Sequence, residues 1–282
     1  AYYCGSCDGD ECTEDAECAS GQCVDGSCVT TPKIEGVSPG DGAGGNLITI
    51  SGEGFGEDEG VITFLGTESG DEVELSAYEC NASTQWSDLQ IIVQVPSAAV
   101  DGPVSVTTSD DETERTDDDY GPSIADFDVN AIERPGVCLL DPDEDDYGSS
   151  IDVYGNSFGE TQGSSTFYFT NYEASSYISW SDDQLDVVVP NVNSGTYLTQ
   201  VFTGDYVCIT SDGKATSTTC SDDEDCDTET GESCATSWCS ESLEYCETDD
   251  DCGEGGDCDS IRVGSNEVSF TVADVSSSSS PV

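Results

Sequence analysis

The chain carries Gly52-Glu-Gly-Phe55-Gly56, then Trp86-Ser-Asp88, then Val93-Gln-Val95-Pro96. The same landmarks return in the same order as Gly155-Asn-Ser-Phe158-Gly159, Trp180-Ser-Asp182 and Val187-Val-Val189-Pro190. Each copy is taken to open with a Pro-x-Ile triplet, at Pro32 and Pro122. Corresponding landmarks lie roughly 90 to 103 residues apart, the size of one small β-sandwich domain. The repeat therefore predicts a tandem array of binding or spacer modules.

Apolar and polar residues alternate in both copies, and this period of two predicts half-buried β-strands. In the first copy, the alternating apolar residues are Ile48 and Ile50, then Leu89, Ile91, Val93 and Val95, with Thr49, Ser51, Gln90, Ile92 and Gln94 between them. In the second copy they are Ile151, Val153, Phe167, Phe169, Leu185, Val187 and Val189. No stretch has a helical period of useful length. The pattern predicts an all-β chain.

The end of the first copy lacks the pattern of a closing strand. After Val104 and Val106 the chain enters Ser109–Asp119, which has seven acidic residues, one arginine and no apolar residue. Such a composition has poor β-propensity. Two interpretations stay open: a short exposed strand closes the sheet, or the sheet edge is left for another segment to pair with.

The second copy is interrupted once. Tyr197–Cys208 is predicted to be a strand, but its expected partner, Val268–Val272, appears only after an insertion at about 209–265. The insertion contains seven cysteines, and its opening spacing resembles that of the cysteines in residues 1–30. We interpret both segments as small disulfide-stapled modules, because neither has enough apolar residues to build a core.

Sixteen cysteines and no histidine indicate an oxidising compartment and a disulfide framework. Spacing leaves the pairing open. Cys208 can join the seven cysteines of the insertion to make an even set of eight, and Cys80 and Cys138 then remain outside that set. Alternatively Cys138 pairs with Cys208, and Cys80 then needs a partner in the insertion or in another chain.

The expected domains are a cysteine-rich module at 1–30, a sandwich at 31–121, a second sandwich with its insertion at 122–275, and a Ser-rich linker-like tail at 276–282. The chain has no methionine and begins at Ala1, a small residue that suits a position after signal-peptide cleavage. We therefore expect secretion. No apolar run is long enough to cross a bilayer, so no membrane insertion is expected.

The charge excludes several partners. The chain has 61 acidic and five basic residues, a formal charge of −56. Nucleic acid and anionic lipid are excluded, because phosphate binding needs lysine and arginine. Most of the acidic residues are interpreted as a solvated surface screened by salt.

Few kinds of chemistry remain. Without histidine, the Ser-His-Asp and Cys-His arrangements and His-ligated metal or haem sites are all excluded. No cofactor is required, and the chain is predicted not to be an enzyme. Calcium is the ion that oxygen ligands suit best. The best local cluster is Asp141, Asp143 and Asp145, although it departs from the EF-hand pattern. A solvated acidic loop and a calcium site are both open there.

The first copy resembles the IPT/TIG domain family. The resemblance rests on Ser38-Pro39, on Ile48-Thr-Ile50-Ser-Gly52-x-Gly54-Phe55-Gly56, on the Val-Pro pair and on Gly102-x-Val104-x-Val106. It implies two tandem immunoglobulin-like β-sandwiches plus small disulfide-rich modules, a role in extracellular adhesion, spacing or assembly, and no catalytic residues. The cysteine module is similar to short repeats in surface proteins of myxobacteria and related bacteria.

We predict a secreted structural protein of the bacterial surface, a homo-oligomeric subunit of an extracellular filament or surface layer. The alternative is a monomeric adhesin or carbohydrate-binding module that stacks glycans on aromatic side chains. The candidates are Trp86, Trp180, Trp238, Tyr172 and Tyr177. Exposed aromatics on one face would favour the alternative, and Trp86 by itself is expected to be a core anchor. The triplet Asn81-Ala-Ser83 is a formal N-glycosylation sequon.

Overall fold

The structure is a computed structural model. It describes residues 32–67, 71–117, 125–203 and 263–273, with Thr13 and the backbone at 23–24, 27–28, 206–209, 215–220, 233–235, 238–239 and 258–259. Strands are the regular secondary structure throughout these ranges, which confirms the all-β prediction. Among the described residues there is no helix with the length and apolar character needed to span a membrane.

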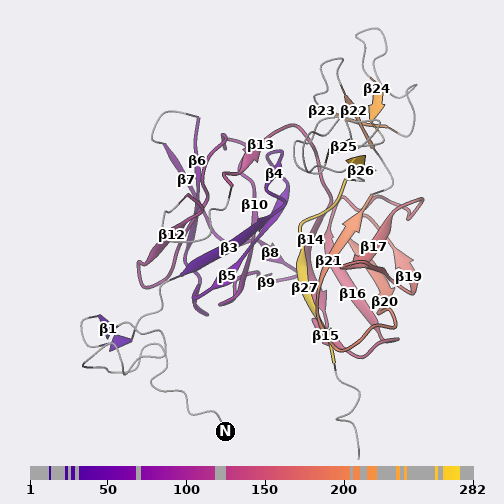
Figure 1. Ribbon diagram of the computed structural model, residues 1–282, viewed down its shortest axis with the longest axis horizontal. Helices are drawn as coiled ribbons and strands as arrows, with labels where there is room; N and C mark the ends of the chain where they lie inside the picture. Colours follow the sequence, from indigo (N-terminus) through magenta and orange to yellow (C-terminus); the bar gives the residue numbers. More distant parts are fainter. Residues whose placement is uncertain are drawn as a thin grey trace, which may run out of the picture. The chain divides into compact units, whose positions relative to one another are not determined.

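The chain folds into two compact units, each built around facing sheets (Figure 1). The first unit comprises Ala1–Asp41 and Ile48–Val129, and the second comprises Gly42–Leu47 and Asn130–Val282.

The first unit pairs a three-stranded with a four-stranded sheet. The smaller sheet has the order β10-β5-β3, with strands Gln90–Gln94, Leu47–Glu53 and Lys33–Ser38. The larger sheet has the order β12-β11-β6-β7, with strands Thr113–Arg115, Ser105–Thr107, Val61–Leu65 and Glu72–Leu75. A separate hairpin joins β8, Glu79–Cys80, to β9, Ser83–Thr84.

The second unit has a four-stranded and a five-stranded sheet. The first has the order β14-β16-β20-β19, with strands Gly136–Asp141, Ser150–Asn156, Gln184–Val188 and Ser176–Trp180. The second has the order β15-β27-β21-β17-β18, with strands Glu144–Asp145, Val268–Val272, Gly195–Phe202, Thr166–Phe169 and Tyr172–Glu173. Only the β15–β27 pair among these named pairings is parallel.

The remaining strands are short. They are β1 Cys23–Val24, β2 Ser27–Cys28, β4 Asp41–Gly42, β13 Asp128–Val129, β22 Tyr206–Ile209, β23 Ala215–Cys220, β24 Ser233–Ala235, β25 Trp238–Cys239 and β26 Cys258–Asp259. Most of the cysteine-rich N-terminal module, most of the insertion and the Ser-rich tail lie outside the described residues, so the predictions made for them stay predictions.

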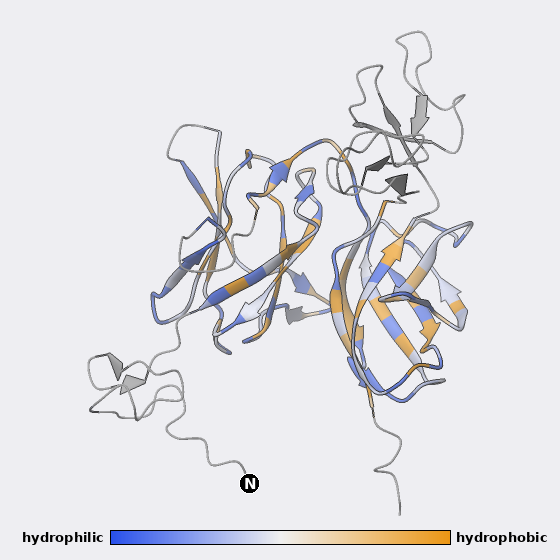
Figure 2. Cartoon of the chain, viewed as in Figure 1, coloured by the Kyte–Doolittle hydropathy of each residue, from blue (hydrophilic) through white to orange (hydrophobic). Residues whose placement is uncertain are grey.

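Each sandwich has its own apolar core, and Figure 2 shows hydrophobic residues alternating with hydrophilic ones along the strands. In the first core, the rings of Phe64 and Phe127 meet edge to face with centroids 5.8 Å apart. In the second, Phe169 meets Phe167 and Phe270 in the same way, at 5.2 and 5.3 Å. Burial of these rings provides much of the stability of each sandwich, because each removes a large apolar area from water.

The predicted alternation holds in the second copy and needs correction in the first. Leu89, expected inside, is 62% exposed because it precedes β10 rather than belonging to it. Ile92 and Thr49, expected outside, are buried, so β5 and β10 are covered on both faces at these positions. Alternation of apolar and polar residues is expected only in a strand that has one face exposed to solvent, and not in a strand that is covered on both faces.

The two copies share a β-bulge that the sequence pattern did not reveal. The pairing of β3 with β5 shifts register at Glu35, and the pairing of β14 with β16 shifts at Cys138. Each bulge lies three residues after a buried proline, at Pro32 and Pro135. Pro135 is therefore the structural counterpart of Pro32, while the Pro122 triplet lies outside the described residues.

A closing strand exists in the first sandwich. β12 pairs with β11 in register, with Val106 opposite Glu114 and Thr107 opposite Thr113. Thr116 continues the contact, since its amide donates to the carbonyl oxygen of Val104 at 3.0 Å. Of the two interpretations of this acidic segment, the short exposed strand is the one observed.

The insertion leaves the second sandwich between two adjacent strands. β21 pairs with β27 along its length, with Tyr197 opposite Phe270. The returning chain is fixed at its root by Ser265, whose hydroxyl accepts a hydrogen bond from the Val201 amide at 3.0 Å. The predicted strand Tyr197–Cys208 is in fact split into β21 and β22.

Candidate functional site

Each of the two repeated tryptophans holds a turn of its own sandwich through a hydrogen bond from its indole N–H, an arrangement that we call a clasp. Trp86 Nε1 donates to the carbonyl oxygen of Gly56 at 3.0 Å. Trp180 Nε1 lies 3.1 Å from the carbonyl oxygens of both Phe158 and Gly159. Both indoles are half-buried, and Trp86 packs against the first core. The prediction that Trp86 is a core anchor is confirmed, and the indole N–H of each tryptophan is used in a hydrogen bond within the fold.

The aspartates that follow these tryptophans hold the same turns. The Gly56 amide donates to Asp88 Oδ1 at 3.0 Å, and the Gly159 amide donates to Asp182 Oδ1 at 2.9 Å. The repeated landmarks of the sequence thus contact one another in space. Their recurrence reflects one structural device used twice, rather than a binding site.

We expect Trp86→Phe to lower the free energy of unfolding by about 1 kcal/mol, because the Gly56 carbonyl loses its donor while the ring volume is largely kept. Urea unfolding checks this, with Trp180→Phe as the equivalent change in the second unit. If both variants unfolded at the same urea concentration as the parent, the clasp interpretation would be wrong.

Tyr177 is also committed to the fold. Its hydroxyl accepts from the Phe167 amide at 2.8 Å and lies 3.4 Å from Glu173 Oε1. Burial raises the pKa of Tyr177 to about 12, so the phenol stays neutral throughout the ordinary pH range. Tyr172 differs, since it is 52% exposed and meets Tyr197 edge to face at 6.2 Å. Trp238 lies in β25, where only the backbone is described.

The outer face of the five-stranded sheet carries a second aromatic pair, whose two residues lie outside the repeated sequence motifs. On β21, Thr199 and Val201 are buried, so Leu198, Gln200 and Phe202 point to the other side of the sheet. Tyr168 of β17 lies directly opposite Gln200.

These four residues form one surface, which we call the β17–β21 face: Tyr168, Leu198, Gln200 and Phe202. The rings of Tyr168 and Phe202 meet edge to face, 5.6 Å apart. Leu198 is 44% exposed, and both rings are half-buried. Gln200 Nε2 donates to the carbonyl oxygen of Ser265 at 2.9 Å, which fixes the amide beside the rings. Alternation along two strands was the signal that could have located this face.

Of the three residues proposed to bind calcium, Asp145 is already hydrogen-bonded within its own loop. Asp145 Oδ1 accepts from the Asp146 amide at 2.7 Å and from the Ser149 hydroxyl at 2.9 Å. Asp141 ends β14, and Asp143 lies in the exposed turn before β15. In the described part of the chain, no group of three or more carboxylate or cysteine side chains is arranged to hold a metal ion. Calcium binding at Asp141, Asp143 and Asp145 stays a prediction.

Three carboxylates line up across the outer face of the four-stranded sheet. Asp141 is opposite Asp152, and Asp152 is opposite Asp186. Burial first, and the charge of Asp152 second, raise the pKa of the Asp186 carboxyl. Gln184 Nε2 donates to Asp152 Oδ1 at 3.0 Å. Like charges directly opposite one another destabilise a sheet, so this row costs stability at neutral pH.

Asp186→Asn is expected to raise the free energy of unfolding at pH 7 by about 0.5 kcal/mol. The raised pKa means that the folded state favours the protonated acid. The charge of Asp186 therefore destabilises the fold fully above the pKa of this carboxyl in the folded state. The effect fades as the pH falls, and it is absent below the pKa of the unfolded state, which is about 3.9. Urea unfolding at pH 7 and pH 3 measures it, with the exposed Glu160→Gln as control. If both substitutions raised the free energy of unfolding at pH 7 by the same amount, the row of opposed carboxylates would not be the cause.

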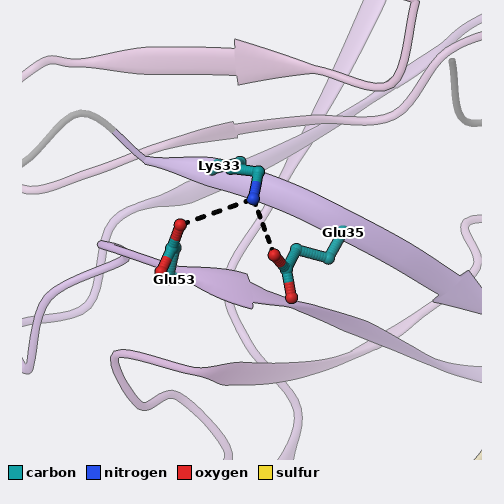
Figure 3. A network of polar contacts seen from close by, with 3 residues as sticks. All are labelled: Lys33, Glu35 and Glu53. Atoms are coloured by element: carbon teal, nitrogen blue, oxygen red, sulfur yellow. Dashed lines mark hydrogen bonds and ion pairs between the residues drawn. The ribbon is translucent and has the colours of Figure 1, made fainter. Parts of the chain in front are cut away.

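Lys33 makes two surface ion pairs. Lys33 Nζ lies 2.7 Å from Glu35 Oε1 and 3.4 Å from Glu53 Oε1 (Figure 3). The hydrogen bond and the charge of Glu35, followed by the contributions of Glu53, raise the pKa of Lys33. All three side chains are exposed, so this network contributes little to stability and presents no free cationic site.

Cys80 and Cys138 are both buried and both disulfide-bonded. Cys80 therefore does not remain a free thiol, and the disulfide prediction is confirmed for these two residues. The pairing of the cysteines in the terminal module and the insertion concerns residues whose side chains are not described.

The fold and these contacts define a protein of tandem immunoglobulin-like β-sandwiches. The family model for the IPT/TIG domain matches residues 32–123 and 142–219. The chain belongs to the IPT/TIG domain family, as the resemblance of its first copy implied.

Curated relatives share a short stretch of sequence. The chain is 43% identical over 70 residues to a cyclomaltodextrin glucanotransferase of Niallia circulans, and 41% identical over 70 residues to that of Bacillus licheniformis. These matches cover 25% of this chain and 8% of each relative, so the chain spans only a small part of their length.

Solved structures show weaker likeness. A surface glycan-binding protein from a xyloglucan utilization locus of Bacteroides uniformis is 16% identical, with 66% of this chain and 58% of that chain covered and a TM-score of 0.23. The BSP domain of a biofilm-associated protein is 16% identical, with 62% and 27% covered and a TM-score of 0.30.

Proposed function

We propose that this protein is a non-catalytic, extracellular surface module that binds carbohydrate through the β17–β21 face. The observation that carries the proposal is the ring pair of Tyr168 and Phe202, set beside the amide of Gln200 on an outer sheet face. Of the two functions predicted from the sequence, this is the alternative rather than the filament.

The chemistry of the face suits a sugar ring. A pyranose has a face of C–H groups and a rim of hydroxyls, so it needs an apolar surface flanked by hydrogen-bonding groups. Tyr168 and Leu198 supply the apolar surface. Gln200, held by its bond to Ser265, supplies a fixed polar group beside it. Amphipathic aromatic side chains are common at binding surfaces for this reason.

The negative charge of the chain favours an uncharged glycan as the ligand. The chain has a formal charge of −56, and Glu173 is opposite Tyr168 at the edge of the face. An anionic polysaccharide or a second copy of this chain would be repelled at low ionic strength. A neutral glucan meets no such penalty.

The curated relatives support the carbohydrate class. They are cyclomaltodextrin glucanotransferases, enzymes named for the transfer of a glucan, and the shared 70 residues are only 8% of each relative. We infer that the shared segment is a non-catalytic module of proteins that act on carbohydrate. The absence of histidine from the chain agrees with a module that performs no reaction. Buried disulfide-bonded cysteines support an extracellular location.

The test is binding to neutral polysaccharides, measured by affinity electrophoresis and by calorimetry with soluble oligosaccharides of α- and β-glucan. Tyr168→Ala combined with Phe202→Ala should weaken binding at least about tenfold, or about 1.4 kcal/mol. Tyr147→Ala is the matched control, since Tyr147 is an exposed tyrosine of the same unit outside this face. Circular dichroism confirms folding. Absence of binding by the parent protein, or equal binding by the double variant, would overturn the proposal.

Assembly into a filament or surface layer stays a prediction. One of its supports was an unpaired edge in the first sandwich, and β12 occupies that edge. Sedimentation of the protein across salt and calcium concentrations tests it. A monodisperse monomer under all conditions would exclude self-assembly.

A further inference from the structure

The hairpin of β8 and β9 presents the chain's single Asn-x-Ser/Thr triplet, Asn81-Ala-Ser83. Cys80 is opposite Ser83, which leaves Asn81 and Ala82 as the two turn residues. Both have positive φ, at 48° and 62°. These are the angles of a type I′ turn, in which asparagine is favoured at the first position.

The base of this hairpin is anchored and its tip is exposed. Cys80 is 4% exposed and disulfide-bonded. The Tyr78 amide donates to the Ile92 carbonyl at 2.8 Å, which joins the preceding residues to β10. In contrast, Asn81 and Ser83 are exposed, and no described residue hydrogen-bonds the Asn81 side chain. The amide is thus offered to solvent on a fixed support.

Turn geometry accounts for asparagine at this position but not for the rest of the triplet. A type I′ turn favours glycine at the second position, whereas this chain has Ala82 there. Ser83 is an exposed strand residue with no described partner for its hydroxyl, so the hairpin itself does not require serine. An acceptor triplet requires a hydroxyl residue two positions after the asparagine.

We propose that Asn81 is the acceptor of an N-linked glycan. The donor is a sugar whose anomeric carbon is activated by a phosphate leaving group. The Asn81 Nδ2–C1 bond forms as the C1–O bond to phosphate breaks, the phosphate leaves with the electron pair, and the transferase takes the amide proton. No oxidation or reduction is involved. The glycan would extend from the hairpin tip, independently of carbohydrate binding at the β17–β21 face.

The test is peptide mass spectrometry of the protein purified from its natural source, before and after treatment with an N-glycosidase. The Asn81 peptide should carry added sugar mass, and the enzyme should convert Asn81 to aspartate. Expressed in the same cells, Ser83→Ala should lose the modification completely. Ser83→Thr should retain it. Asn81→Asp keeps the turn chemistry and should also be unmodified.

Two results would overturn the proposal. One is a native Asn81 peptide that is entirely unmodified. The other is modification that persists in Ser83→Ala, which would show that the triplet is not what the transferase recognises. Comparing the unfolding midpoints of Ser83→Ala and Ser83→Thr separates loss of modification from loss of folding, because Ser83 is exposed and neither change alters the turn residues.

Discussion

Gly52→Ala is expected to lower the free energy of unfolding of the first sandwich by about 2–4 kcal/mol. A Cβ at this position would lie 2.6 Å from Phe55 Cζ and would collide with the carbonyl oxygen of Lys33. Phe55 is fully buried, so its ring cannot move aside without disturbing the core. Calorimetry should show the transition of this unit lowered on the order of 10 °C.

Gly40→Ala is the matched control, because a Cβ there would meet only the Val37 carbonyl oxygen, at 3.9 Å. That substitution should leave the melting temperature nearly unchanged. Gly155→Ala repeats the experiment in the second sandwich, where the Cβ would collide with the Phe158 ring and the Gly136 carbonyl. If Gly52→Ala and Gly40→Ala melted alike, close packing at the glycine would be disproved.

Asn266→Ala is expected to destabilise the second sandwich by about 2–4 kcal/mol. Asn266 is fully buried, its Oδ1 accepts from the Val137 amide at 2.8 Å, and its Nδ2 donates to the Val137 carbonyl at 2.7 Å. Alanine would leave both backbone groups of Val137 buried without partners. The side chain links the root of the insertion to β14, so urea unfolding should show a lower midpoint.

Asn193→Ala serves as the control, since Asn193 is an exposed asparagine of the same unit. It should change the midpoint by no more than about 0.5 kcal/mol. A further check is hydrogen exchange at the Val137 amide, which should accelerate in Asn266→Ala alone. Unchanged protection of that amide would show that the two hydrogen bonds are not significant for stability.

The repeated landmarks were visible in sequence because they are structural rather than functional. Gly52 packs closely against Phe55, and Trp86 and Asp88 both hydrogen-bond Gly56, so the same residue types recur in the same order in each sandwich. Aromatic candidates chosen from those landmarks, such as Trp180, proved to be committed to the fold. The candidate binding face carries no repeated motif and was missed for that reason.

Local patterns also could not locate contacts between distant residues. Asn266 and Val137 are far apart in the sequence, and their hydrogen bonds depend on how the two sheets face each other. The burial of Ile92 and the exposure of Leu89 depend on where β10 begins and on what covers its second face. Propensity and periodicity report on one strand at a time.

The sequence by itself determined the all-β class, the two tandem sandwiches and the disulfide chemistry, because these follow from the period of the apolar residues and from the residue counts. Tertiary structure alone decided that the tryptophans are clasps, that β12 closes the first sandwich, and that Tyr168 and Phe202 share an outer face. The reason is physical: which face of a strand is wet, and which side chains meet, depend on neighbours that pairing and packing bring from elsewhere in the chain.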